Sequence, residues 1–445
     1  MNFEIAKEIL VKAAKDVGLC EYEIYYTDSS QISTETLKDE ISSFSGGSGA
    51  GISFRCIVDG HMGVAATELF EESELTALVK RAMDNASVIE NSDLAVIFGG
   101  SESYNETTMP PFEMPETAYL KDLALSVQEK TYRSSPLVTD GTQSGVFAEI
   151  NRFEIVNSKG LHLTNTVGVG GVFVQSVINK DGEAQEAFDF CLGYEDAHKL
   201  SSATTEQAIS KLGAADVPSG KYNIILDGKQ MRAMLSAFSS VFSGKNALLG
   251  LSLLKGKEGQ RIAADCVTLC DDPLMEGSSV QTPFDGEGVA TYKKNVIENG
   301  VLRTLLYDLS VAHKAGVTTT GNGQRGSYAQ QVNIAPFTFY IKGGELSDEE
   351  LLGRMGDGIY VTELKGLHAG ANAVTGDFSI ESAGYLVEGG KKTKAVKGFT
   401  IAGNFFDMLK GIEAVAKDVK FGLPSGFTTF GSPDVFLGQM SVAGK

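Results

Sequence analysis

The sequence predicts an α+β fold in two domains, both built mainly from antiparallel strands. A chain of 445 residues is longer than one compact core usually supports, so two domains are expected. The 51 glycines are accompanied by only 10 prolines, which indicates many tight turns and close backbone contacts rather than a disordered tail. Helical and strand patterns also follow one another without the regular strand–helix–strand rhythm of a parallel sheet.

The N-terminal part predicts helices packed on a mostly antiparallel sheet. Apolar residues recur at helical spacing from Phe3 to Val17, and Gly18 suits the left-handed residue that ends such a helix. A second apolar helical face runs from Leu75 to Ala86, and Pro115 marks the start of a third helix. The segments EYEIYYTD, ISTETLK and GISFRCIVDG alternate in the manner of strands.

A long antiparallel meander is expected over residues 145–191, with turns at NSKG and NKDG. GGSGAG, residues 46–51, lacks the lysine of a phosphate-binding loop and is interpreted as a hairpin or bulge. A helix over 195–212 leads to AADVPSG, whose small residues, proline and glycine suggest a linker. We therefore expect an N-terminal α+β domain over 1–215 and a C-terminal, glycine-rich, mainly antiparallel domain over 216–445.

Three helices are expected in the C-terminal domain, over 230–242, 346–355 and 405–419. The second of them opens with Ser347 and Glu350 at the spacing of a capping box.

Composition excludes several classes of function. A formal charge of −19 repels phosphate backbones, so a direct nucleic-acid partner is not expected. Five scattered cysteines do not make a secreted disulfide framework and fit a reducing compartment. The N-terminus, MNFEIAKEILVKAAKDVG, does not have the pattern of a signal peptide, and no apolar run approaches the ~20 residues that a membrane span needs. The expectation is a soluble cytoplasmic protein.

The stretch GNGQRG, residues 321–326, matches the glycine pattern of a dinucleotide-binding loop. That fingerprint needs a strand before it and a helix directly after it, whereas here a helical stretch precedes and Pro336 ends any helix that follows. Two interpretations of Arg325 stay open: a contact to an anionic group such as a peptide carboxylate, or a solvent-facing residue in a turn.

No recognisable metal motif is present. The five histidines are too far apart in sequence for two of them to share a helical face. Cys266 and Cys270, four residues apart, are interpreted as two small buried thiols on one face of a strand. Asp285 and Glu287 in TPFDGEGV have a spacing that suits a hard cation, and turn chemistry explains them equally well.

A second polar cluster lies in GLHAGANAVTGDFSIESAGYLVEGG, which contains His368, Asp377, Glu381 and Glu388. FSIESAGYLVEGG alternates as a strand does, with Phe378 on one side and Glu381 on the other. We therefore expect these residues to serve the structure rather than to bind a metal.

Several blocks in order resemble the TldD/PmbA family: SVFSGK, CVTLCDDPLMEGSSVQTPFDGEGVATYKKNVIENGVLRTLLYDLSVAHKAG, TGNG, VTELKGLHAGANAVTGDFSIESAGYLVEGG and VKGFTIAGNFFDMLKGIEAVAKDV. In that family two related kinds of subunit pair as a cytoplasmic zinc metallopeptidase that acts on peptides and unfolded segments. The TldD kind carries H-E-x-x-x-H on a helix early in the C-terminal domain and a further cysteine ligand near the C-terminus. The TldE kind, also called PmbA and once described as a modulator of DNA gyrase, lacks these ligands.

The resemblance is closer to the PmbA/TldE kind. The helix after the strand YNIILDG reads KQMRAMLSAFSSVFSG, and the tail FGLPSGFTTFGSPDVF has no cysteine. Lys229, Gln230, Met231 and Arg232 do not replace a pair of imidazoles, since protonated lysine and arginine repel a dication. The resemblance thus implies no catalytic residue and no metal in this chain, with zinc in a TldD-type partner.

By a weaker inference from the residues, Asp285, Glu287 and Arg325 are the candidates for lining a peptide groove. Two alternatives stay open. The chain is a homodimeric peptide-binding or regulatory protein, or it is an autonomous metallopeptidase with an unrecognised set such as Asp285, Glu287 and His313. Whether the chain alone is an enzyme is therefore undecided by the sequence.

Overall fold

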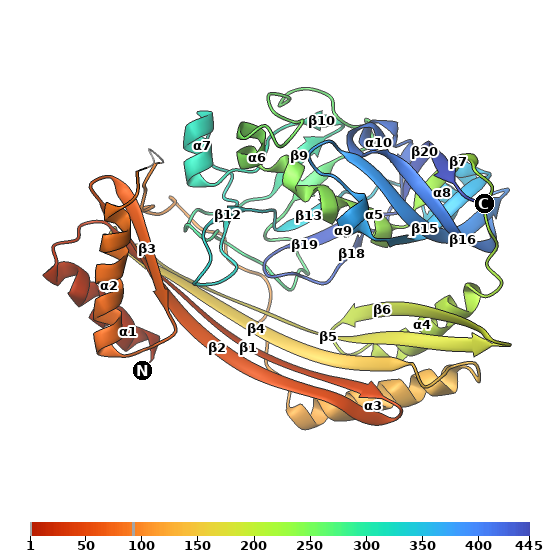
Figure 1. Ribbon diagram of the computed structural model, residues 1–445, viewed down its shortest axis with the longest axis horizontal. Helices are drawn as coiled ribbons and strands as arrows, with labels where there is room; N and C mark the ends of the chain where they lie inside the picture. The colour runs from red at the N-terminus through yellow and green to blue at the C-terminus, as the bar shows by residue number, and fades with distance from the viewer. Residues whose placement is uncertain (1, 91–93) are drawn as a thin grey trace.

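The N-terminal half is built on one long, curved sheet (Figure 1). The computed structural model describes residues 2–90 and 94–445. All neighbouring strands in this sheet are antiparallel, in the order β3-β2-β1-β4-β5-β6. Their bounds are β1 (Tyr22–Leu37), β2 (Glu40–Val58), β3 (His61–Thr67), β4 (Gln143–Asn157), β5 (His162–Lys180) and β6 (Glu183–Leu192).

Four helices pack on this sheet, two at each end: α1 (Phe3–Asp16) and α2 (Glu72–Ser87) at one end, α3 (Thr117–Ser134) and α4 (Ala197–Ser210) at the other (Figure 1). Helix α1 starts at Asn2, whose side chain accepts a hydrogen bond from the Ile5 amide. The first, second and third helices expected from the sequence are present, and α3 begins two residues after Pro115.

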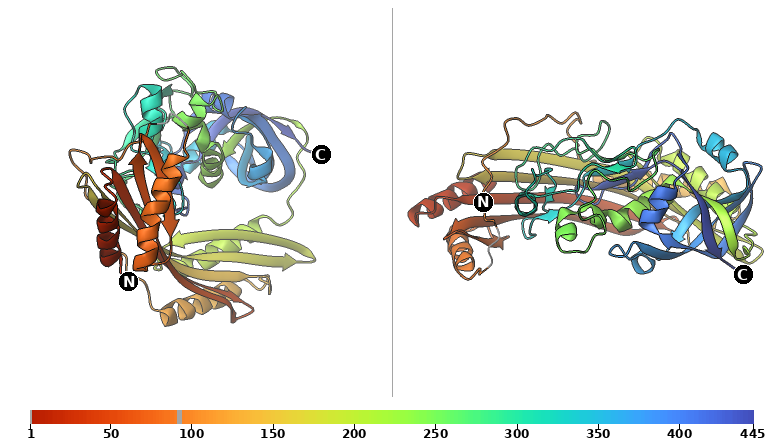
Figure 2. Two further views of the ribbon diagram at one scale, coloured as in Figure 1. Left: turned by 60° about the vertical axis from the view of Figure 1, so that its left-hand side comes forward. Right: turned by 90° about the horizontal axis from the view of Figure 1, so that it is seen from above.

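Side chains alternate between the two faces of β1, and this alternation decides what each face meets. Tyr22, Ile24 and Tyr26 lie in the core that α1 and α2 cover. Glu23 and Tyr25 lie on the opposite face and contact residues from the C-terminal half. The C-terminal half lies over this second face (Figures 1 and 2).

Two six-stranded sheets form the C-terminal half. One has the order β16-β15-β14-β7-β20-β17, and a further pairing of β16 with β20 closes its first five strands into a ring. The other has the order β10-β9-β8-β13-β19-β18. The bounds are β7 (Gly220–Leu226), β8 (Leu269–Asp271), β9 (Lys294–Glu298), β10 (Val301–Leu302), β13 (Thr338–Ile341), β14 (Gly358–Lys365), β15 (Asp377–Glu388), β16 (Lys391–Asn404), β17 (Ala414–Val415), β18 (Lys420–Phe421), β19 (Thr429–Ser432) and β20 (Val435–Ala443).

Helix α5 (Gly228–Phe238) joins these two sheets, since it contacts β14 in the first and β19 in the second. Its Phe238 stacks on Phe405 with 4.4 Å between ring centroids, in the main core of the domain. The remaining elements are the 3₁₀ turn η1 (Ser239–Phe242), α6 (Gly244–Leu248), α7 (Leu309–Ala315), α8 (Asp348–Met355), α9 (Leu367–Gly370), α10 (Phe405–Gly411), β11 (Gly323–Gln324) and β12 (Asn333–Ile334).

The predicted fold class is confirmed: helices on a mostly antiparallel sheet are followed by a mainly antiparallel second half. The capping box at Ser347 and Glu350 is present at the start of α8. Residues 211–219 connect α4 to β7, and the predicted linker AADVPSG ends at Gly220, the first residue of β7. No helix in the described ranges combines the length and the apolar character needed to cross a bilayer.

Three local predictions are wrong. GGSGAG is neither a hairpin nor a bulge but continues β2, where Gly46 pairs with Ile32 of β1 and the pairing stays in register to Gly51. The helix expected over 405–419 ends at Gly411, because Ala414 and Val415 pair with β20. Cys270 is buried in β8 as expected, whereas Cys266 is exposed and lies before that strand.

Candidate functional site

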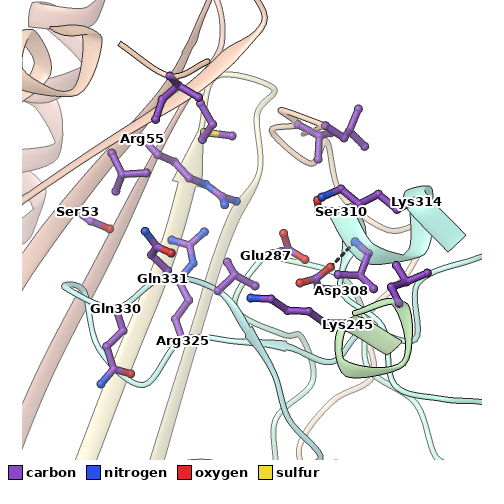
Figure 3. A pocket seen from close by; sticks show the side chains of 18 of the residues that line it. Ser53, Arg55, Lys245, Glu287, Asp308, Ser310, Lys314, Arg325, Gln330 and Gln331 are labelled. Atoms are coloured by element: carbon purple, nitrogen blue, oxygen red, sulfur yellow. Dashed lines mark hydrogen bonds between the residues drawn. The ribbon is translucent and has the colours of Figure 1, made fainter. Parts of the chain in front are cut away.

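A pocket of about 560 Å³ lies between the two halves of the chain (Figure 3). The N-terminal wall comes from β2, β3 and the segment after α2, and the C-terminal wall from α6, α7 and the loop around residues 325–332. The lining residues are Ser53, Arg55, Met62, Val64, Ile89, Leu94, Val96, Lys245, Leu248, Leu249, Glu287, Asp308, Ser310, Val311, Lys314, Arg325, Gln330, Gln331 and Val332. Its size is that of a pocket for a small organic molecule or a few peptide residues.

Two arginines from opposite walls converge on one buried carboxylate. Glu23 and Arg55 face each other across β1 and β2, so their side chains share a face of the sheet. Arg55 contacts Glu23 with Nε–Oε1 at 2.8 Å and donates from Nη2 to Oε2 at 2.9 Å. Arg325 donates from Nη2 to Glu23 Oε1 at 2.7 Å, and its guanidinium lies 4.5 Å from the centre of the Tyr25 ring. This ion-paired cluster joins the two halves.

Asp285 and Glu287 belong to a tight turn that also depends on close backbone contacts. Asp285 Oδ1 accepts hydrogen bonds from the amides of Glu287, at 2.9 Å, and Val289, at 3.0 Å, and its Oδ2 accepts from the Gly323 amide at 2.9 Å. Glu287 Oε2 accepts from the Leu309 amide at 2.9 Å. A Cβ atom at residue 323 would lie 2.7 Å from Glu287 Oε2, so any larger residue there would displace the Glu287 carboxyl.

Burial controls the protonation of this acidic pair. Burial raises the pKa of Glu287 to about 8, and the charge of Asp285 raises it too. Burial likewise raises the pKa of Asp285, while its three backbone hydrogen bonds act in the opposite direction. The Glu287 carboxyl is therefore largely protonated at neutral pH, and perturbed carboxyls of this kind are typical of functional sites.

The structure brings the three candidate groove residues together. Glu287 and Arg325 line the pocket. Asp285 does not line it, but its carboxylate accepts a hydrogen bond from the Glu287 amide and so fixes the turn. Arg325 is 4% exposed, so the interpretation as a solvent-facing turn residue is wrong. His313, the third member of the alternative metal set, is exposed on α7 and does not line the pocket.

Glu23 and Arg55 were not anticipated as site residues. Each is a charged residue inside an apolar strand, in EYEIYY and GISFRCIV. That pattern was the available signal, because a charge at a buried strand position needs a partner. Arg55 pairs with Glu23 on the neighbouring strand, whereas the second partner of Glu23, Arg325, lies about 300 residues away in sequence, and only the tertiary structure reveals it.

Helix α5 presents no imidazole or carboxylate. Its polar side chains instead bond to neighbouring protein groups. Lys229 contacts Asp189 at 2.7 Å, and Gln230 donates to the Thr362 carbonyl at 2.8 Å. Arg232 donates to the carbonyl of Phe421 in β18.

Next to this helix, Asp434 forms a second buried network. Its Oδ1 accepts from the Gly228 amide at 2.7 Å and from the Lys420 ammonium, and its Oδ2 accepts from the Tyr360 hydroxyl at 2.8 Å. Burial raises the pKa of neighbouring Asp227, which caps α5 by accepting from the Lys229 amide. Across residues 2–90 and 94–445, no group of three or more His, Cys, Asp or Glu side chains is arranged to hold a metal ion.

His368, Asp377, Glu381 and Glu388 are not gathered into a site either. Three of them lie along β15 and His368 lies in the short α9. Phe378 and Ile380 are buried whereas Asp377, Ser379 and Glu381 are exposed, which confirms the predicted alternation.

Solved structures resemble this one over nearly the whole chain. A proposed modulator of DNA gyrase from Thermotoga maritima is 30% identical, with a TM-score of 0.89, and the match covers 99% of this chain and 100% of the other. TldE from Thermococcus kodakarensis is 23% identical, with a TM-score of 0.90 and coverage of 98% and 100%, which shows a shared fold.

Sequence comparisons also find relatives over most of the chain. An uncharacterised protein from Methanocaldococcus jannaschii is 29% identical over 91% of this chain and 93% of its own length. The model of the PmbA/TldA metallopeptidase C-terminal domain matches residues 219–444, and that of domain 1 of the same family matches residues 22–86. The first of these matches spans just over half of the chain, so this protein belongs to the PmbA/TldD metallopeptidase family.

Proposed function

We propose that this chain is the noncatalytic, PmbA/TldE-type subunit of a cytosolic zinc metallopeptidase whose other subunit is of the TldD type. The observation that carries the proposal is the composition of α5. The helix offers lysine, glutamine, methionine and arginine at the position where a TldD-type subunit would place its zinc ligands. Among the solved structures of similar fold is one described as TldE.

Zinc does not fit this position. A catalytic zinc site needs three protein ligands, drawn from imidazole, thiolate and carboxylate groups, and an open position for water. Around α5, Lys229, Arg232 and Lys420 are cations. The carboxylates there already have partners: Asp189 pairs with Lys229, Asp227 caps the helix, and Asp434 is bonded to an ammonium, a phenol and a backbone amide. Any zinc and the glutamate that activates water are assigned to the partner.

A role in holding extended peptides is supported by the edge of the N-terminal sheet. Strand β3 pairs with β2 only from Ile52 to Val58, and no described strand pairs with the outer edge of β2 over residues 40–51. This edge includes the glycines of GGSGAG, so few side chains obstruct its backbone. Unpaired strand edges bind extended peptides by adding a strand.

The test compares three samples: this chain alone, a TldD-type partner alone, and the two mixed. We expect no peptide cleavage by this chain, and chelator-sensitive cleavage in the mixture that exceeds the activity of the partner alone. The samples are incubated with an unfolded protein substrate, and products are followed by mass spectrometry. Cleavage by the metal-stripped single chain would falsify the assignment, and so would a failure of the two chains to associate.

A matched variant sharpens the experiment. Arg232→Lys keeps the charge but cannot reproduce the bonds to the tail carbonyls, and it should leave cleavage by a mixture unchanged within about twofold, because the proposal gives α5 no contact with the reacting bond. A loss of tenfold or more in cleavage, with association intact, would place α5 in the catalytic machinery and contradict the proposal.

A further inference from the structure

The two arginines that line the interdomain pocket, Arg55 and Arg325, carry more N–H groups than their protein acceptors use. A guanidinium carries five N–H groups. Within the described ranges, Arg325 donates a hydrogen bond only from Nη2, to Glu23, and its buried Nε has no acceptor. Arg55 directs its bonds to the same carboxylate, and Figure 3 shows both guanidinium groups facing the pocket beside Gln331. The carboxylate of Glu23 is thus the shared acceptor of both Arg55 and Arg325.

The charge of the lining favours an anion. Four basic side chains line the pocket, together with the two carboxyl groups of Glu287 and Asp308, and the buried carboxylate of Glu23 pairs with two of the four. Both carboxyl groups are already used by backbone amides at the start of α7: Leu309 donates to Glu287 at 2.9 Å and Val311 to Asp308 at 2.7 Å. Burial keeps Glu287 largely neutral at pH 7. With Glu287 neutral, the four basic side chains outnumber the ionised carboxylates of Glu23 and Asp308, in contrast to the charge of −19 that the whole chain carries.

The rest of the pocket is apolar. Aliphatic side chains from both walls line it: Met62, Val64, Ile89, Leu94, Val96, Leu248, Leu249, Val311 and Val332. Several of them are unusually open to solvent for their type, with Leu249 63% and Leu94 39% exposed. A ligand that suits this pocket therefore joins one anionic group to an apolar body.

We propose that this pocket binds the free C-terminal carboxylate of a peptide whose last side chain is apolar. The planar guanidinium groups of Arg55 and Arg325 match a carboxylate geometrically, and the aliphatic wall accommodates the terminal side chain. In its protonated form Glu287 has a proton to donate to the bound carboxylate. This inference rests on the proposed function, and it names the end of the peptide that this subunit holds.

The test measures binding of a fluorescein-labelled Ala-Ala-Leu peptide to the full-length chain, without a partner, by fluorescence anisotropy. The same peptide with a C-terminal amide is the comparison. We expect the free acid to bind at least about tenfold more tightly than the amide, since a charge-assisted hydrogen bond is lost with the amide. Equal binding of the two peptides, or binding of neither, would overturn the proposal.

Two variants of pocket residues and one control variant locate the site. Lys245→Ser alters an exposed residue on the pocket wall, and we expect the free acid to bind several-fold more weakly. Lys410→Ser, at a half-exposed lysine on α10 that does not line the pocket, is the matched control and should bind as the unaltered chain does. Arg325→Gln should abolish the preference for the acid over the amide; a preserved preference in a folded Arg325→Gln protein contradicts the proposal.

A competition arm separates the carboxylate from other anions. Inorganic phosphate at the concentration of the peptide should not displace it, because phosphate has no apolar body to contact the aliphatic wall. Complete displacement would show a phosphate site and overturn the assignment. Because no cleavage is measured, this binding result is independent of whether the chain acts as a noncatalytic subunit.

Discussion

Replacing Glu287 by glutamine should change how the stability of the protein depends on pH. Glutamine keeps the shape of the side chain and an oxygen that can accept from the Leu309 amide, but it cannot ionise. In the folded protein burial, followed by the charge of Asp285, raises the pKa of Glu287 from the ordinary 4.5 to about 8. The native state therefore holds a proton on this carboxyl at pH values where the unfolded chain has lost it.

The sign and size of the effect follow from proton linkage. Between about pH 4.5 and pH 8 the native state binds more protons than the unfolded state, so the free energy of unfolding falls as the pH rises. Each pH unit in this window is worth at most about 1.4 kcal/mol. The contribution is complete below pH 4.5 and is lost once the pH passes about 8. From pH 5 to pH 8 the unaltered protein should lose up to about 4 kcal/mol relative to Glu287→Gln.

Thermal unfolding measures this difference. A domain of 150–250 residues shifts its midpoint by roughly 2–4 °C per kcal/mol, so the two midpoints should move relative to each other by on the order of 10 °C between pH 5 and pH 8. Glu298→Gln, at a carboxyl that is 40% exposed and pairs with Arg303, serves as the control and should show no such change. Parallel midpoints for Glu287→Gln and the unaltered protein at every pH would refute the reasoning, since they would mean that Glu287 ionises as it does in the unfolded chain.

Three other substitutions test the packing that positions the pocket. Arg325→Met should lower the free energy of unfolding by about 3 kcal/mol or more, because it removes one of the two guanidinium partners of buried Glu23. Urea unfolding followed by circular dichroism would show this as a lower midpoint. An unchanged midpoint would mean that the ion pair is not formed. Gly63→Ala should destabilise the N-terminal half by more than about 1 kcal/mol, since the added Cβ would lie 1.9 Å from a carbonyl oxygen of α2. Native-state proteolysis should then cut the N-terminal half faster than in the unaltered protein. An unchanged cleavage rate would mean that α2 has room to move away from the added methyl group. Phe238→Ala should cost about 3–5 kcal/mol, because the ring is fully buried and stacks on Phe405; a loss below 1 kcal/mol in calorimetry would contradict that packing.

Local sequence patterns were sufficient to predict a helix or strand where its buried residues recur at a regular period. The apolar face of α1 and the alternation of β15 were both visible in the sequence, because each repeats at the period of its own element. Prediction failed where a partner strand decided the outcome. The glycines at 46–51 have weak strand propensity, yet they continue β2 because β1 pairs with them along its whole length. Residues 414–415 leave a helical pattern because β20 pairs with them.

The sequence by itself determined the fold class, the resemblance to the TldD/PmbA family and the absence of imidazole and carboxylate from α5, because these depend on residue type and order along the chain. Only the tertiary structure decided that Asp285, Glu287 and Arg325 share a site, and that Glu23 and Arg55 complete it. The physical reason is that the protonation and pairing of a charged side chain depend on burial and on neighbours hundreds of residues away. The sequence of a single strand or turn shows neither how deeply its side chains are buried nor which distant residues contact them.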